Sequence, residues 1–427
     1  MTGTDAELYL RLAGERALAS RDGSAGPTWD GPVMVAARAL VAVGAVEAPV
    51  ARQVVEDYEL AVELRAGGPG PRRQTRAASA ASAPGSGARP VPAALPVPRM
   101  TLCDTTITLP SATIRVRSVS VSPRSVSVGV DLTAPGALSG RGGWPPGIRL
   151  TDDRGVSVPA DFSGGGFSGG SDHEWRGRYR SDTPLAGDTR WVEVEGERID
   201  LDDRPPSARV TVAGLPAGDP AMRYLWRQVA GGRRYYVQGE GRWLLQAAVD
   251  ALAAVGAIDP GSPELADLWA VLDALADPHP PGRDQRLPEP WRSLLARRGR
   301  GDGPVGEVAV GAATPPLDRD VSVLVAGLRS GPEEFEIEVE MTGFPMNFRP
   351  FAAVADESQD LVWWAADDRG NRYLGEPGRW ASTPDGSAGT IEFWPALDPR
   401  AAVLELMPTA VTEQAVITVP LPWAAAR

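Results

Sequence analysis

One segment carries the residue spacing of a serine hydrolase. Residues 166–170 are Gly-Phe-Ser-Gly-Gly, which fits the pattern G-x-S-x-G with Ser168 as the nucleophile. That chemistry needs a strand, a sharp turn and a helix to hold the serine exposed, followed by an acid and then a histidine. Glycine and serine follow instead of a helical pattern, and His173 comes almost at once. We therefore predict a loop of a β-domain here rather than a catalytic turn.

Two further groups of side chains offer metal ligands. Asp172, His173 and Glu174 are adjacent, and consecutive residues rarely converge on one ion. The aspartate pairs at 152–153 and 367–368 carry the hard oxygens that calcium prefers, and each pair precedes Arg-Gly. The same residues suit a β-turn, where Asp bonds to nearby backbone and Gly takes a positive φ. We expect turns, no metal and no cofactor; calcium at the aspartate pairs is the alternative.

Composition excludes several chemistries and classes of partner. All 43 basic residues are arginine, so no Schiff-base, P-loop or kinase lysine exists. Two histidines and one cysteine cannot form an ordinary zinc site or an intrachain disulfide. A net charge of −12 argues against nucleic-acid or membrane-surface binding. No signal-peptide pattern and no apolar run of ~18 residues is present, so a cytoplasmic protein is expected.

Charged residues form two candidate interaction segments. Glu336 and Glu338 belong to a run in which glutamate alternates with apolar residues. This is either the solvated face of a strand or an acidic surface that docks a basic partner, such as the arginine-rich segment of the same chain. Arg72 and Arg73 lie in that segment, and they offer a nonspecific contact for an anionic partner.

The chain has 13 tryptophans, and four of them gather in the last β segment: Trp363, Trp364, Trp380 and Trp394. Adjacent residues on a strand point to opposite faces, so only one indole of the 363–364 pair can lie in a core. The other is expected to pack between domains, to anchor a protein or peptide, or to form a platform for a glycan.

The sequence contains two copies of one arrangement, a helical segment followed by a β segment. Residues 36–47 (AARALVAVGAVE) match residues 248–259 (AVDALAAVGAID), and the Asp-Asp-Arg-Gly segment at 152–155 recurs at 367–370. The two matches occur in the same order at nearly the same separation, which predicts a tandem duplication. Apolar residues at i, i+3 and i+4 predict amphipathic helices around the first match, and strict alternation over 114–132 predicts a hairpin with one buried and one wet face.

These patterns predict an α+β multidomain protein, a tandem duplication of a small helical bundle followed by an antiparallel β-sandwich. The expected units are helices at 1–65, a disordered Arg/Pro/Ala linker at 66–99, a sandwich at 100–215, helices at 216–303 and a sandwich at 304–427. The strand rhythm and the Asp-Asp-Arg-Gly hairpin resemble bacterial immunoglobulin-like modules at the level of fold, without the Cys…Trp…Cys signature of antibody domains.

No convergent set of catalytic side chains emerges from this sequence, and the duplicated plan builds large surfaces. We therefore expect a non-catalytic protein-interaction or scaffold protein, with a protein as partner. The alternatives are a hydrolase with paired carboxylates in a cleft, or a ligand- or glycan-binding module that uses exposed tryptophans.

Overall fold

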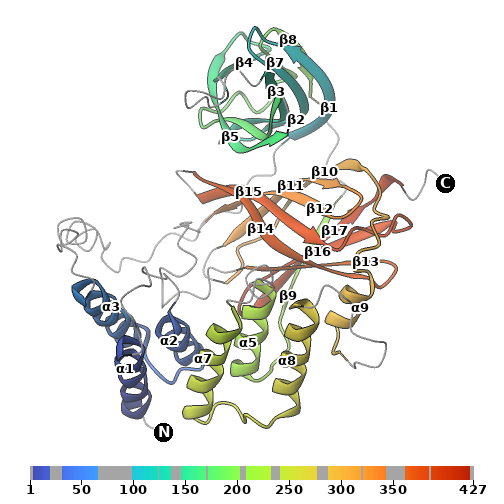
Figure 1. Cartoon of the computed structure of the whole chain (residues 1–427). Helices are drawn as coiled ribbons and strands as arrows, with labels where there is room; N and C mark the ends of the chain where they lie inside the picture. The colour runs from blue at the N-terminus through green and yellow to red at the C-terminus, as the bar shows by residue number, and fades with distance from the viewer. Residues whose placement is uncertain are drawn as a thin grey trace.

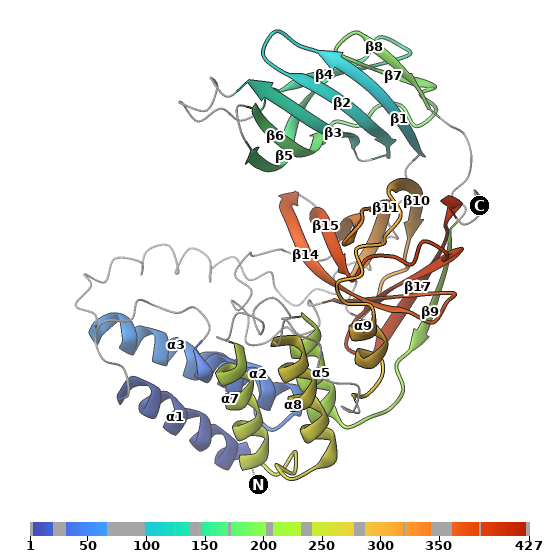
Figure 2. The same cartoon turned by 45° about the vertical axis from the view of Figure 1, so that its right-hand side comes forward.

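The computed structural model describes most of the chain, and within the described residues it has seven helices and two large antiparallel sheets (Figure 1). The helices lie at one end, the C-terminal sheet in the middle and the N-terminal sheet at the other end (Figures 1 and 2). The described residues are 3–19, 31–65, 99–123, 125–135, 145, 147–169, 172–201, 208–231, 241–276, 287–318, 321–342, 361–383 and 386–423.

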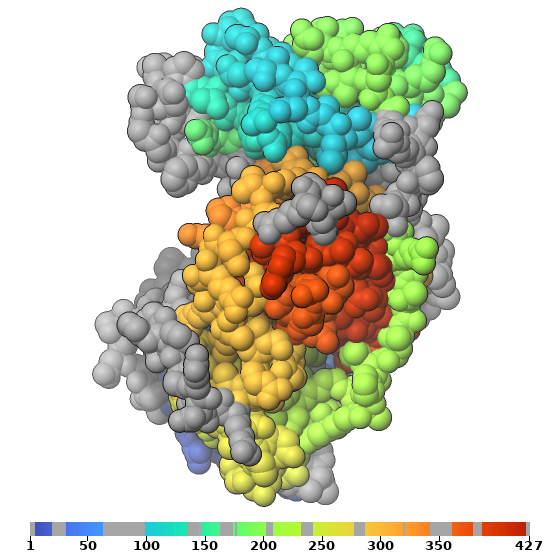
Figure 3. All heavy atoms as spheres, turned by 90° about the vertical axis from the view of Figure 1, so that its right-hand side faces the viewer, coloured from blue at the N-terminus to red at the C-terminus, as the bar shows by residue number. Residues whose placement is uncertain are grey.

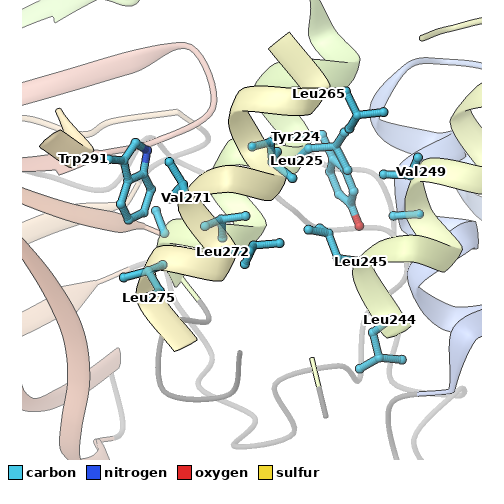
Figure 4. Packing of buried hydrophobic residues seen from close by; sticks show 14 of the residues in the cluster. Tyr224, Leu225, Leu244, Leu245, Val249, Leu265, Val271, Leu272, Leu275 and Trp291 are labelled. Carbon is cyan, nitrogen blue, oxygen red and sulfur yellow. The ribbon is translucent and has the colours of Figure 1, made fainter. Parts of the chain in front are cut away.

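The helices of both halves pack into one body. They are α1 (Gly3–Ala19), α2 (Pro32–Ala42), α3 (Ala48–Arg65), α5 (Pro220–Gly231), α7 (Gly241–Ala254), α8 (Pro263–Ala276) and α9 (Trp291–Ala296). Val35 and Ala39 of α2 are buried in the same core as the leucines of α5, α7 and α8, which Figure 4 shows from close by. Ala251 of α7 in turn lies in the core of α1, α2 and α3.

The two sequence matches at 36–47 and 248–259 end their helices in the same way. Gly44 and Gly256 have φ angles of +69° and +70°, the left-handed conformation that glycine adopts without strain. The next residues, Ala45 and Ala257, donate their N–H groups to Leu40 and Leu252, both at 2.8 Å. The shared Val-Gly-Ala sequence is therefore a helix stop signal in each half.

The first sheet has eight strands in the order β1-β2-β3-β6-β5-β4-β7-β8 and curls into a nearly closed barrel, which we call the first barrel (Figure 1). Alternate residues of its strands fill the interior, including Val128, Leu150 and Tyr179. Its strands are β1 (Arg99–Thr108), β2 (Thr113–Val121), β3 (Val126–Pro135), β4 (Ile148–Asp152), β5 (Ser157–Gly169), β6 (Asp172–Ser181), β7 (Trp191–Val194) and β8 (Glu197–Asp200).

The second sheet repeats that order as β10-β11-β12-β15-β14-β13-β16-β17 and adds β9 at its end; we call it the second barrel. The register shifts recur too: β1–β2 and β10–β11 each slip once, and so do β2–β3 and β11–β12. Its strands are β9 (Arg209–Gly214), β10 (Gly306–Ala313), β11 (Ser322–Ser330), β12 (Phe335–Thr342), β13 (Val362–Asp367), β14 (Arg372–Thr383), β15 (Gly386–Trp394), β16 (Val403–Thr409) and β17 (Glu413–Pro420).

The fold class expected from sequence is wrong. Each β region is one barrel-like sheet rather than a two-sheet sandwich, and the helices form one shared body rather than a bundle ahead of each β region. Alternation marks which side chains face a core, but it does not specify whether strands close into one sheet or divide into two. Strand β9 adds a link between halves, because it follows the first barrel in sequence and pairs with β17 of the second.

Candidate functional site

Carboxylates of one barrel meet guanidinium groups of the other. Glu338 on β12 pairs with Arg178 on β6, and Glu340 accepts from Arg180 at 3.0 Å, with Arg178 at 3.6 Å. In each strand the residues concerned alternate with core residues, so all of them project from the outer face. The glutamate run therefore contacts a basic face of the same chain, which belongs to β6. The arginine-rich segment that we considered as its partner lies outside the described residues.

A second ionic cluster lies beside the first. Glu307 on β10 accepts hydrogen bonds from Arg117 of the first barrel and, at 2.8 Å, from Arg329 of its own barrel. Asp131 lies 3.6 Å from Arg329 and 3.7 Å from Arg117. Glu336 completes the cluster at 3.4 Å from Arg329. Charges of both signs alternate across the boundary, which favours one register of the two barrels.

Small residues allow this close approach, which Figure 3 shows as the contact of the first barrel with the second. A Cβ atom at Gly129 would lie 3.6 Å from Glu338, and one at Gly327 would lie 3.1 Å from the side chain of Met100. Ser118 and Ser120, on the face of the 114–132 hairpin expected to be wet, are buried. Their short polar side chains suit a surface covered by another polar surface rather than by water.

An open cleft of about 640 Å³ lies at the edge of this boundary. Three guanidinium and five carboxylate groups line it, along with the β11–β12 turn. The charged lining residues are Arg115, Arg117, Arg329, Asp131, Glu307, Glu333, Glu334 and Glu336. Glu333 and Glu334 are exposed at the turn and have no ion-pair partner within the described residues. The lining therefore has an excess of negative charge, and the exposed turn with Glu333 and Glu334 carries the part that no described ion pair neutralises.

The tryptophans of the last β segment are placed differently from one another. Trp363 is buried inside the second barrel. Trp364 points the opposite way and meets Trp291 of α9 edge-to-face, with ring centres 5.2 Å apart, while Trp291 stacks on Trp226 of α5 at 5.9 Å. Trp394 packs against the same helical core. These indoles join the helices to the second barrel, one of the alternatives expected for them.

The first half lacks these aromatic residues at the equivalent positions. When the two Asp-Asp-Arg-Gly turns are aligned, Arg149 occupies the position of Trp364. When the Tyr-Leu pairs at 9–10 and 224–225 are aligned, Arg11 occupies the position of Trp226. Ser181 in β6 and Phe393 in β15 occupy equivalent positions in the strand register. The residues that follow them, Asp182 and Trp394, therefore correspond to each other. Charged groups at these positions account for the helices docking on the second barrel and not on the first.

The Asp-Asp-Arg-Gly turns use their aspartates in backbone hydrogen bonds. Asp152 Oδ1 accepts from the N–H groups of residues 154 and 156 at 2.9 and 2.8 Å, and Asp367 Oδ1 accepts from those of residues 369 and 371, both at 2.9 Å. No group of three or more metal-ligating side chains occurs in the described part of the chain. The turn interpretation accounts for the geometry of both segments.

A buried polar network supports the second turn. The hydroxyl of Tyr373 donates to Asp367 at 2.6 Å and accepts from the N–H of Asp398 at 3.2 Å. Asp398 pairs with the buried Arg297 at 3.2 Å and with Arg400 at 3.1 Å. Hydrogen bonds from Arg400 lower the pKa of Asp398 to about 2, and burial raises that of Tyr373. These shifts arise from a buried structural network at the joint between α9 and the barrel.

The remaining candidates have simpler placements. Ser168 lies in β5 directly opposite His173 in β6, so the G-x-S-x-G segment is part of a hairpin and not the loop we expected. Cys103 is half-buried, and burial raises its pKa to about 11, which disfavours the reactive thiolate. Trp380 lies in β14, but its side chain is outside the described atoms, as are Arg72 and Arg73.

Sequence reasoning did not identify the arginines of β6 or the helical tryptophans as partners. Arg178 and Arg180 alternate with glycine and tyrosine in the same period as the glutamates of β12, and that matching period was the available signal. Trp226 and Trp291 sit on short helical patterns, and nothing local indicates that they stack together.

Comparisons with known proteins assign no family to the chain. No protein family and no curated protein sequence matches the chain significantly. The crystal structure of the conserved domain protein from Bacillus anthracis aligns over 72% of this chain and 77% of its own, at 10% identity and a TM-score of 0.19. No helix in the described residues is both long and apolar enough to cross a bilayer.

Proposed function

We propose that this protein is a non-catalytic cytoplasmic binding protein whose partner site is the cleft between the two barrels. The observation that carries the proposal is the charge of that cleft, with five carboxylates against three guanidinium groups around about 640 Å³. The three arginines are already paired, Arg117 and Arg329 with Glu307, Asp131 and Glu336, and Arg115 with Asp104. Among the described lining residues, Glu333 and Glu334 therefore supply the unpaired charge of the cleft.

The partner that fits is a lysine- or arginine-bearing segment of another protein. Glu333 and Glu334 lie at the exposed turn, where they attract cations at long range without a desolvation cost. The walls are strands and a tight turn, in which the N–H of Gly331 bonds to the carbonyl of Glu334 at 2.9 Å. A site on such elements holds its geometry before the partner arrives, which limits the entropy lost on binding.

The alternative functions find less support. The carboxylate pKa values that shift within the described residues shift downward, whereas a general acid needs a raised pKa. Trp363, Trp364 and Trp394 are engaged in packing, so none of them forms an open platform for a sugar.

The test is binding of a fluorescent oligo-arginine peptide to the full chain, measured by anisotropy at low salt. We expect the Glu333→Gln/Glu334→Gln variant to bind at least about tenfold more weakly. Glu264→Gln/Glu405→Gln removes the same charge from exposed positions elsewhere and is expected to bind like the wild type. Equal losses in both variants, or no loss in the first, would contradict a site in the cleft.

A further inference from the structure

The two sets of helices carry matching sequence segments, but they differ in how far their outer faces are covered. In the second half, Arg227 of α5 donates to the carbonyls of Thr409 and Ala410 of the second barrel at 3.2 and 2.6 Å. Val271 and Ala274 of α8 are fully buried beside them. This face of α5 and α8 is therefore covered by α9 and the second barrel (Figures 1 and 4).

The corresponding face of α1 and α3 is open and carries exposed leucines. Alignment of the Tyr-Leu pairs at 9–10 and 224–225 places Leu12 at the position of Arg227. Alignment of the prolines at 49 and 263 places Asp57 at the position of Val271 and Leu60 at the position of Ala274. Leu12 and Leu60 are 42% and 54% exposed, and Leu8, one turn before Leu12, is 56% exposed. Single exposed leucines are ordinary on a protein surface, but three on two helices packed side by side mark a contact site.

An ion pair lies among these leucines. Arg11, adjacent to Leu12 and one turn after Leu8, bonds to Glu7 at 2.8 Å and approaches Asp57 of α3 at 4.0 Å. The face thus carries apolar groups and both signs of charge together. A surface of that composition is complementary to itself, which is what a two-fold interface between identical chains requires.

We propose that this face, formed by Leu8, Arg11, Leu12, Asp57 and Leu60, binds the same face of a second copy of the chain. A two-fold rotation brings the leucines of both copies together and lets Arg11 of each copy pair with Asp57 of the other. α1 has 17 residues, or ~25 Å of helix, so the helical pair offers roughly 500 Å² per copy. That is below the ~800 Å² of a standard interface, so the dimer forms reversibly and depends on concentration. This inference does not depend on the cleft between the barrels.

Sedimentation velocity on the full chain, from about 1 to 200 µM, tests the dimer. We expect a rising dimer fraction for the wild type and a dissociation constant at least about tenfold higher for Leu12→Glu. Leu102→Glu is the matched control, because Leu102 is an exposed leucine on the first barrel, 38% exposed. Far-UV circular dichroism confirms that each variant folds.

A charge exchange then tests the proposed contact itself. Arg11→Glu alone places two acids opposite each other at each contact, and Asp57→Arg alone places two bases there, so each variant is expected to remain monomeric. An equimolar mixture restores opposite charges across the interface and is expected to form a heterodimer. A monomeric wild type at the highest concentration, or a mixture that stays monomeric, would overturn the proposal.

Discussion

At the scale of single residues, Asp398 connects Tyr373, Arg297 and Arg400 in one network of the second barrel. Asp398 is buried, and its pKa of about 2 is lower than in the unfolded chain. A depressed carboxylate pKa stabilises the fold above the unfolded value, near 4, and this contribution is lost as the pH falls toward 2. The difference corresponds to about 2–3 kcal/mol, available at neutral pH.

Asp398→Asn keeps the shape of the side chain but removes one of the two carboxylates that pair with the buried Arg297, the other being Asp302. We expect the free energy of unfolding at pH 7 to fall by about 3 kcal/mol, since the buried guanidinium loses its buried carboxylate partner and keeps only the more exposed Asp302. The variant should also lose less stability than the wild type between pH 4 and about pH 2. Denaturant titrations at several pH values measure both effects, with Asp200→Asn, in an exposed pair with Arg198, as control. Parallel pH profiles for variant and wild type would count against this assignment.

Some of these residues were predictable and others were not. The Asp-Asp-Arg-Gly turns were predictable because their hydrogen bonds are local: Asp152 and Asp367 bond to the backbone two and four residues on. The partners of Glu338 and Asp398 were not, because Arg178 and Arg297 come from strands and helices over a hundred residues away. Sequence shows that such charges exist, but their pairing depends on how the elements pack.

At the scale of elements, the tryptophans decide which barrel receives the helices. Periodicity predicted the helices around 36–47 and 248–259 and the alternating strands, because each pattern reflects one element facing one core. It could not predict that α2 and α7 share a core, or that β9 joins β17, since these contacts link elements with similar patterns. The substitution of Trp364 by Arg149 between halves becomes interpretable only once their positions are known.

Trp364→Arg introduces into the second half the residue that the first half carries. We expect the free energy of unfolding to fall by about 3 kcal/mol, because the edge-to-face contact with Trp291 is lost and a charge enters an apolar joint. The helical signal at 222 nm should then disappear at lower denaturant than the signal of the barrel tryptophans. Trp243→Arg is the control, since Trp243 is 45% exposed on α7. If the two signals still coincide and the midpoint is unchanged, the joint does not depend on Trp364.

At the scale of the whole molecule, the two junctions of the second barrel differ in chemistry. The helices reach it through indoles and leucines, whereas the first barrel meets it mainly through ion pairs across β6, β12, β2 and β10. Apolar contact strengthens with salt or is unaffected by it, whereas these ion pairs, whose side chains are 14–30% exposed, are screened in part. Salt is therefore expected to weaken the junction between the two barrels but not the junction between the helices and the second barrel.

We expect the first barrel to separate from the second in about 1 M NaCl, where the Debye length falls to ~3 Å, while the helices stay docked. Glu338→Gln/Glu340→Gln should separate at lower salt, because it removes the carboxylates that hold Arg178 and Arg180. Small-angle scattering would record separation as a larger radius of gyration with unchanged circular dichroism. Glu264→Gln/Glu405→Gln, with the same net charge, should follow the wild type. A radius that is constant with salt in every variant would mean that buried contacts, rather than charge, hold the barrels together.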